Sequence, residues 1–241
     1  MLELVAIFVV VGLASVTQIV SGFGSALVAV PLLAAIVGAK TAVVGTTILF
    51  PLISLRILTR SHADVRWRAA STAFVASLAG MPLGLVVISA VDDRALQVVI
   101  AVVVLVFTAM LWRGFSLPEH GPAIDVLAGF ASGTLATSTG TSGPPLVIAL
   151  AARRFAPSAF RATLSAVFFA QSLASIAAFA IARKIDAEAM RMFAVGLPAL
   201  VLATVAGERA FGGLEPARFR LLVFGLLFAS AAVSLAGALV G

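Results

Sequence analysis

Charged side chains gather in short clusters along this chain, and eight stretches of 15 or more residues between them carry no charge. The stretches are 4–39, 41–55, 69–91, 95–112, 126–152, 162–182, 192–207 and 221–241. A helix needs roughly 20 predominantly apolar residues to cross a bilayer, with a usable range of about 17–25. Six of the stretches fit one crossing each once flanking residues are included, which predicts a polytopic, all-α membrane protein.

The other two stretches are too long for one crossing and contain residues that interrupt helices. Stretch 4–39 has 36 residues and stretch 126–152 has 27. Between Ser132 and Pro145, twelve of fourteen residues are Gly, Ser, Thr or Pro. Inside a helix, Gly costs about 1 kcal/mol and Pro about 3 kcal/mol relative to Ala. We therefore expect a broken or re-entrant segment at each of these two positions.

The two halves of the chain resemble each other in three short matches that occur in the same order. Gly12-Leu-Ala-Ser15 matches Gly129-Phe-Ala-Ser132, Leu27-Val28 matches Leu146-Val147, and Gly80-Met-Pro82 matches Gly196-Leu-Pro198. The longest polar stretch, 113–125, separates the halves. The sequence therefore predicts two four-segment membrane repeats, an N-terminal one at 1–118 and a C-terminal one at 119–241, each beginning with a broken segment.

Composition narrows the class of protein further. Of the 241 residues, 62% are hydrophobic and 11% are charged, and the mean hydropathy is +1.19. Soluble domains average about 45–50% apolar and 25% charged residues. These values exclude a soluble enzyme, a disordered chain and a nucleic-acid binder. The chain has no Cys, which also excludes disulfides and thiolate metal sites.

The 16 Lys and Arg residues indicate an orientation. They divide 8 against 8 if all eight stretches cross once, but 11 against 5 if the two long stretches enter and leave on the same side. Cytoplasmic loops are enriched in Lys and Arg, so only the second arrangement defines an orientation. Each half then crosses three times, and the repeats are inverted, as in many transporters. The eleven cytoplasmic residues are Arg56, Arg60, Arg66, Arg68, Arg113, Arg153, Arg154, Arg161, Arg209, Arg218 and Arg220.

The two interrupted segments hold polar residues that carry no charge. From these segments we expect a substrate-binding site that contains Ser21, Gly22, Phe23, Gly24, Ser25, Thr139, Gly140, Thr141, Ser142, Gly143 and Pro144. Broken backbone inside a membrane must be buried in protein or line a wet cavity. A helix N-terminus offers N–H donors and about half a positive charge, which suit an anion, and Pro31 and Pro144 fit the starts of the following half-helices. The alternative is close helix packing through small residues.

Three further polar residues complete the candidate site. Gln18 and Gln171 lie within apolar stretches, where each can contact substrate or make an interhelical hydrogen bond. Arg56 can guide anions toward the cavity or can extend its charged end to the membrane surface. Phe23 can form a wall of the cavity or pack as an ordinary aromatic. Pro51 is expected to kink a helix.

The absence of ionisable residues from the eight stretches limits the chemistry. None of them contains Asp, Glu or His. Cation and proton carriers commonly place such residues inside the membrane, which argues against a cation pump and leaves any proton coupling to boundary groups such as Asp125. No Walker motif for ATP hydrolysis is present. We expect no catalytic residue, no metal and no cofactor, and therefore no enzyme.

Two motifs resemble the signatures of a known family. The stretch from Ser21 to Leu33 and the stretch from Gly129 through Gly143-Pro-Pro-Leu resemble the two signatures of the sulfite exporter TauE/SafE family of bacterial membrane permeases. The family often has further Gly where this chain has Ser25 and Ala26. The residues that the resemblance assigns to the signatures are Ser21, Gly22, Phe23, Gly24, Pro31, Gly133, Gly140, Gly143 and Pro144.

The resemblance implies transport of small sulfur-containing anions such as sulfite, sulfonates or sulfo-carboxylates, often as export. We accordingly expect a multi-pass exporter of the bacterial inner membrane that works by alternating access. Its partners are a small anion and the lipid bilayer, with no nucleic acid, and its oligomeric state stays open. The alternatives are a passive anion channel and a transporter of another small organic anion.

Overall fold

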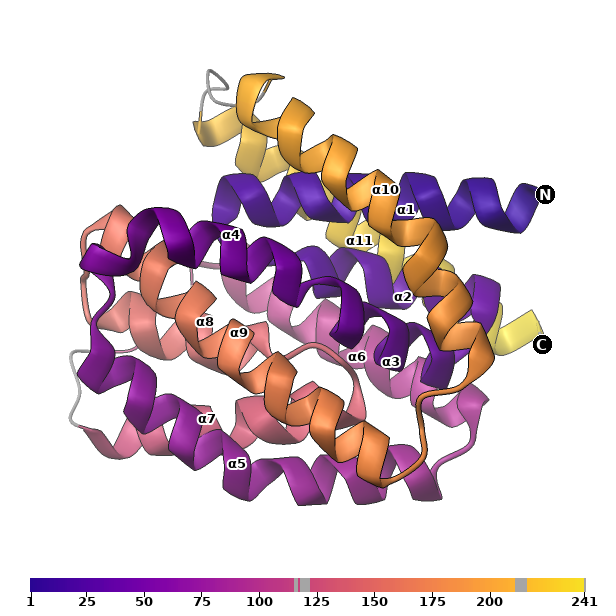
Figure 1. Cartoon of the computed structure of the whole chain (residues 1–241), viewed down its shortest axis with the longest axis horizontal. Coiled ribbons are helices and arrows are strands. Elements are labelled where there is room, and N and C mark those ends of the chain that lie inside the picture. The colour runs from indigo at the N-terminus through magenta and orange to yellow at the C-terminus, as the bar shows by residue number, and fades with distance from the viewer. Residues whose placement is uncertain (115–116, 118–121, 211–215, 241) are drawn as a thin grey trace.

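The computed structural model describes residues 1–114, 117, 122–210 and 216–240, and within these ranges all regular structure is helical (Figure 1). The prediction of an all-α protein is thereby confirmed. The helices are α1 (Leu2–Ser21), α2 (Ser25–Val37), α3 (Ala39–Leu49), α4 (Pro51–Ser61), the 3-10 turn η1 (His62–Asp64), α5 (Trp67–Ala90), α6 (Asp93–Trp112), α7 (Pro122–Ser138), α8 (Gly143–Ala152), α9 (Pro157–Ile181), α10 (Ala187–Ala210) and α11 (Pro216–Val240). The predicted boundary between the repeats, at 118–119, lies outside the described residues.

Several helices are long and apolar enough to cross a membrane, which confirms the prediction of a polytopic membrane protein. The described residues contain six such spans: Leu2–Ser21, Ala39–Asp64, Trp67–Ala90, Asp93–Trp112, Pro157–Ile181 and Ala187–Ala206. The second span joins α3 and α4 through Phe50, which keeps helical backbone angles (φ −76°, ψ −15°). Pro51 then begins α4. The first position of a helix suits proline because an N–H there would have no acceptor within the helix.

Both long stretches are broken, as the sequence predicted. The first breaks at residues 22–24, between α1 and α2, and the second at 139–142, between α7 and α8. Gly22 (φ +85°), Gly24 (φ +96°) and Gly140 (φ +67°) adopt the left-handed conformation. Glycine adopts this conformation readily because it has no Cβ atom, so these residues are where the chain can turn out of one helix and into the next.

Pro31 does not lie near the start of its helix, and that sequence expectation was wrong. The helix α2 begins at Ser25, and Pro31 occupies its interior. A proline inside a helix leaves the carbonyl four residues earlier without its usual N–H donor. That carbonyl belongs to Leu27 and lies 3.5 Å from the hydroxyl oxygen of Ser230 in α11. The Ser230 hydroxyl donates its one proton to the Leu227 carbonyl at 2.9 Å, so α11 places a polar group beside the freed carbonyl without fully satisfying it.

Each broken segment returns to the side from which it starts. Asp125, in the first turn of α7, forms an ion pair with Arg153, which directly follows α8. Figure 1 shows α2 running back alongside α1, and these two helices are in contact. Glu3 Oε1, at the start of α1, lies 3.6 Å from Arg191 Nη1, at the start of α10. The two segments are thus helical hairpins, not single long helices.

Loops 62–66 and 153–156 lie on one side of the molecule. The backbone N–H of Arg66 donates to Thr163 Oγ1 at 3.0 Å. The Arg66 guanidinium carbon lies 6.0 Å from the centre of the Phe155 ring. The sequence placed these two loops together only in the arrangement in which the long stretches re-enter, and the contacts agree with that arrangement.

Helices α5 and α7 cross with their backbones in contact. A Cβ atom on Gly84 would lie 2.1 Å from the Thr134 carbonyl oxygen, and one on Gly133 would lie 2.0 Å from that of Ser77. The Thr134 hydroxyl also donates to the Gly80 carbonyl at 3.1 Å. Small residues allow such close approach between membrane helices. This crossing holds the second broken segment in place.

Candidate functional site

A cavity of about 60 Å³ lies between the two helix breaks. Nine of the fourteen predicted site residues line it, namely Gln18, Phe23, Gly24, Ser25, Gly140, Thr141, Ser142, Gly143 and Gln171. A single water needs roughly 10–15 Å³ by this measure, so the cavity has room for about four waters or one small oxyanion. Among the described residues that line the cavity, none carries an ionisable side chain. The site is therefore polar but uncharged.

The first break presents the N-terminus of α2 to the cavity. Gly24, Ser25, Ala26 and Leu27 all line it. Val28 N–H bonds to the Gly24 carbonyl at 3.1 Å, but the helix itself supplies no acceptor for the amides of Ser25, Ala26 and Leu27. No side chain caps this helix start. The backbone here combines donors that have no acceptor within the helix with the positive end of the helix dipole, which suits an anion.

The second break contributes fewer amides and more hydroxyl groups. Helix α8 begins at Gly143, and Pro144 and Pro145 follow without any N–H to offer. The hydroxyl oxygens of Thr139 and Thr141 lie 2.7 Å apart. Thr141 and Ser142 line the cavity, while Thr139 supports Thr141 from behind. The two breaks are thus chemically unequal, and α2 provides the denser set of backbone donors.

Two glutamines connect the broken segments to neighbouring helices. Gln18 Nε2 donates to Ser54 Oγ at 2.9 Å, and the Ser25 hydroxyl donates to Gln18 Oε1. Gln171 Nε2 donates to Ser132 Oγ at 3.0 Å. The predicted interhelical hydrogen bonds are confirmed for both glutamines. Since both side chains also line the cavity, contact with substrate stays a prediction.

Five predicted residues do not line the cavity: Ser21, Gly22, Thr139, Pro144 and Arg56. The Ser21 hydroxyl is 2.7 Å from the Thr17 carbonyl and 2.5 Å from that of Phe23, so it stabilises the end of α1. Arg56 is half-buried on α4, two residues after the cavity-lining Ser54. Two residues correspond to about 200° around a helix, which directs Arg56 away from the cavity.

Sequence reasoning missed the walls that α3, α4 and α9 supply. Thr46, Thr47, Phe50 and Ser54 come from the second span, and Phe168, Ser172 and Ser175 come from α9. Stretches 41–55 and 162–182 have the composition of ordinary membrane spans, so nothing in that composition marks their hydroxyl groups as part of a site. The spacing of Phe168, Ser172 and Ser175 by four and three residues, beside Gln171, was the available signal, because it places them on one helix face.

Ser175 lines the cavity and has a buried hydroxyl group that no described residue uses. Its side chain is 1% exposed, and its hydroxyl oxygen has no partner among the described residues. A buried polar group without a partner costs free energy unless a ligand or water satisfies it. Ser175 is therefore available to bind a guest inside the cavity.

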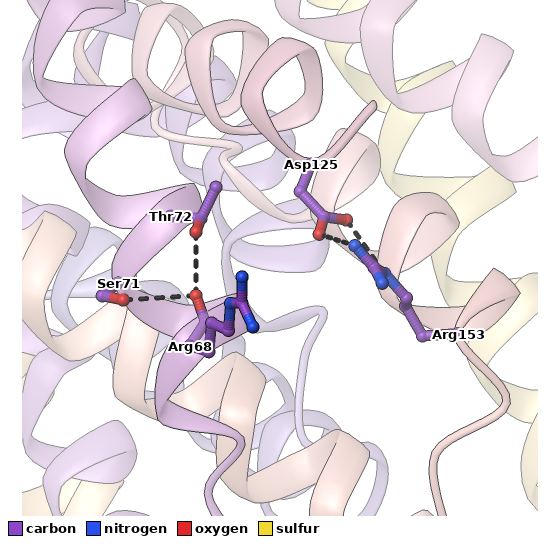
Figure 2. Close-up of polar contacts among 5 residues, drawn as sticks. All are labelled: Arg68, Ser71, Thr72, Asp125 and Arg153. Carbon is purple, nitrogen blue, oxygen red and sulfur yellow. Dashed lines mark hydrogen bonds and ion pairs between the residues drawn. The ribbon is translucent and has the colours of Figure 1, made fainter. Parts of the chain in front are cut away.

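Asp125 and Arg153 lie at the mouth of the second hairpin and not in the cavity. Figure 2 shows the two side chains turned toward each other as an ion pair, with Asp125 3% and Arg153 27% exposed. Asp125, a candidate for proton coupling in the sequence, thus serves to close the hairpin. The same view shows the start of α5, where the hydroxyls of Ser71 and Thr72 donate to the Arg68 carbonyl at 3.2 and 2.9 Å.

Comparison with known proteins identifies the family. A family model described as "Sulfite exporter TauE/SafE" matches residues 7–234. A curated protein of Cupriavidus necator named "Probable sulfite/organosulfonate exporter TauE" is 25% identical over 234 residues, which cover 94% of this chain and 91% of the relative. No solved structure matches the chain. The matched family comprises transporters, in agreement with the prediction that this protein is not an enzyme. With almost its whole length matched, this chain belongs to the sulfite exporter TauE/SafE family.

Proposed function

We propose that this protein exports small sulfur-containing anions, such as sulfite, sulfonates or sulfo-carboxylates, across the bacterial inner membrane by alternating access. The observation that carries the proposal is the uncharged polar cavity between the two helix breaks. Its hydroxyls and the amides at the start of α2 are donors that match the oxygens of a sulfite or sulfonate group. The relative's name supports the substrate class.

Binding in this cavity rests on hydrogen bonds and the helix dipole instead of a full charge. Ser175 contributes a hydroxyl that is not used elsewhere, and α2 contributes backbone N–H groups. Such donors hold an anion without a permanent ion pair, so a substrate can also leave. A carrier needs this balance, because binding that is too tight would stop transport. The proposal requires no metal and no cofactor.

Inverted repeats would supply the moving parts. If the halves are related by a two-fold axis, α1 corresponds to α7 and α10 corresponds to α5. In support, α1 packs against α10 and α7 against α5, and α6 packs against α11. The two hairpins would then approach the cavity from opposite sides of the bilayer. Rocking of one repeat against the other around a central site is a common form of alternating access.

The basic side of the molecule is proposed to face the cytoplasm. Loops 62–66 and 153–156 carry Arg66, Arg153 and Arg154 and lie together on that side. The side chains of Arg209, Arg218 and Arg220, which the charge count also assigns to this side, lie outside the described residues. Both chain ends would face away from the cytoplasm, in accordance with the positive-inside rule.

Flux measurements in liposomes test this proposal. The purified protein is reconstituted, and uptake of labelled sulfite, sulfoacetate, taurine and sulfate is measured. We expect saturable flux with counterflow for at least one sulfur oxyanion. Conductive flux that does not saturate would indicate a passive channel instead. Absence of flux and of binding for every anion tested would contradict the proposal.

A further inference from the structure

One face of α9 carries buried polar atoms that have no partner. Four buried side-chain nitrogen or oxygen atoms lack a hydrogen-bond partner in the part of the chain that the structure describes, and three belong to α9: Arg161 Nε, Ser165 Oγ and Ser175 Oγ. With Phe168 and Ser172, these residues follow a spacing of four and three. At about 100° per residue, all five lie within roughly 40° of one line along the helix.

The unpartnered hydroxyls contrast with other buried hydroxyls of the protein. Ser15, Thr46 and Thr204 each donate to the carbonyl four residues earlier, at 2.7, 2.7 and 2.6 Å. This bond is the usual way to satisfy a hydroxyl inside an apolar helix. Ser165 (0% exposed) and Ser175 (1%) do not make it. Both hydroxyls therefore keep a hydrogen-bonding capacity that no described residue uses.

Arg161 holds a positive charge at the cytoplasm-facing end of the same face. Its Nη2 donates to the Ile19 carbonyl at 2.6 Å, in the last turn of α1. Its side chain also packs on the first break, where a Cβ atom on Gly22 would lie 2.8 Å from Arg161 Cγ. The bond to Ile19 fixes the guanidinium, and Nε remains buried without an acceptor.

Phe168 separates this end of α9 from the central cavity. Phe168 lines the cavity and is 9% exposed, whereas Arg161 and Ser165 do not line it. Seven residues of helix, about 10 Å, separate Arg161 from Phe168. Phe23, in the break between α1 and α2, also lines the cavity. The polar face of α9 is thus divided into two sections with an aromatic side chain between them.

We propose that Arg161 and Ser165 form a second anion-binding site, here called the access site, between the cytoplasmic surface and the central cavity. This inference rests on the proposed transport of sulfur oxyanions. A sulfite or sulfonate group accepts hydrogen bonds from the Arg161 guanidinium and the Ser165 hydroxyl, since charge-assisted bonds from Arg suit such oxygens. Displacement of Phe168 then admits the anion to Ser172 and Ser175.

Cysteine protection tests the access site directly, because the chain contains no native Cys. The variants Ser165→Cys and Ser175→Cys are reacted with a small water-soluble maleimide, with and without sulfoacetate. Sulfite is not used as the protectant because it adds to maleimides itself. We expect sulfoacetate to slow labelling of both variants at least threefold. Ala63→Cys, at an exposed position in η1, is the control and should react at the same rate with or without sulfoacetate.

Charge removal supplies a second, independent measurement. Arg161→Gln in the Ser165→Cys background should raise the sulfoacetate concentration that halves the labelling rate about tenfold, the effect expected for loss of a charge-assisted hydrogen bond. Arg161→Lys should restore most of the protection. Arg154→Gln removes an exposed charge from the preceding loop and should leave the value unchanged. A purely structural role of Arg161, through its bond to Ile19, would lower the melting temperature of Arg161→Gln without changing the sulfoacetate concentration that halves labelling.

The outcomes separate the two proposals. If sulfoacetate protects Ser175→Cys but not Ser165→Cys, the access site is wrong and the central site stands. If it protects neither variant, the proposed transport of organosulfonates fails as well. A Ser165→Cys variant that folds but never reacts also overturns the access site. If Arg161→Gln does not fold, protection of Ser165→Cys decides the question alone.

Discussion

Gly24 is the residue at which backbone conformation and the candidate site are most directly linked. Its φ of +96° lies in the left-handed region, and a Cβ atom there would be 3.3 Å from Thr17 Cγ2. We expect Gly24→Ala to lower the free energy of unfolding by about 1–2 kcal/mol, the cost of the left-handed conformation for an L-residue. Gly143→Ala is the control, because its Cβ would meet only Phe168 Cζ, at 3.8 Å. Thermal unfolding in detergent should show a clearly smaller loss for Gly143→Ala.

Gly143 also allows a test of the cavity itself. A leucine at this position projects its side chain from the start of α8 toward Phe168, where the cavity lies. We expect Gly143→Leu to insert and fold but to lose most transport, because the side chain fills a space of only about 60 Å³. Membrane insertion is measured by expression and gel filtration, and transport is measured by labelled sulfoacetate flux. Normal flux in the folded variant would remove the proposed site.

The bond between Gln18 and Ser54 anchors the first hairpin to α4. Ser54→Ala removes the acceptor of Gln18 Nε2 in a fully buried position. A buried donor that loses its partner costs about 1–3 kcal/mol. We expect a loss of stability in that range, measured by thermal unfolding, together with weaker anion protection against heat. An unchanged melting temperature would contradict a stabilising role of this bond.

At the scale of elements, the crossing of α5 and α7 depends on direct backbone contact. Gly133→Ala would place a Cβ atom 2.0 Å from the Ser77 carbonyl oxygen, which belongs to a rigid helix. We expect a loss of several kcal/mol or a failure to fold, because one of the two helices must move. Gly12→Ala is the matched control, since nothing lies within 4 Å of its Cβ position. That change should be neutral or stabilise α1 by up to about 1 kcal/mol. Equal melting temperatures for the two variants would contradict this account.

Local composition explains which elements the sequence could predict. Gly22, Gly24 and Gly140 marked both breaks because left-handed turns and proline-started helices have a strong residue preference. The role of Pro31 could not be predicted in the same way. Its freed Leu27 carbonyl lies 3.5 Å from the hydroxyl oxygen of Ser230, which is far away in the sequence. Tertiary contacts of this kind override the local rule that places proline at the start of a helix.

The candidate site likewise has one part that local composition predicts and one part that depends on tertiary contacts. The half that comes from the breaks was predictable, because glycine and hydroxyl residues are unusual inside an apolar stretch. The half that comes from α9 was not, since Ser172 and Ser175 look like ordinary small residues in a span. Their importance depends on the position of α9, which contacts α3, α4, α5, α7 and α8. Only the assembled fold shows that one face of this helix is turned toward the cavity.

At the scale of the whole molecule, the return of the second hairpin rests on an ion pair at its mouth. Asp125 is 3% exposed where it pairs with Arg153. Breaking a buried pair is costly because one charge stays buried, although the partial exposure of Arg153 reduces the effect. We expect Arg153→Gln to cost roughly 1–3 kcal/mol. Glu3→Gln, which breaks an exposed contact with Arg191, should cost less than about 1 kcal/mol. Thermal unfolding of the two variants should therefore differ.

Membrane orientation provides the most complete test of the architecture. If both long segments re-enter, Ala63 in η1 and Ala156 before α9 lie on the cytoplasmic side, and Ala187 at the start of α10 lies on the opposite side. All three residues are exposed, and the chain has no native Cys, so single Ala→Cys variants report their positions cleanly. An impermeant maleimide applied to whole spheroplasts should label Ala187→Cys at once. It should label Ala63→Cys and Ala156→Cys only after permeabilisation. Three crossings per half require loops 62–66 and 153–156 to share one side. Opposite labelling of Ala63→Cys and Ala156→Cys would therefore refute both the re-entrant hairpins and the inverted repeat.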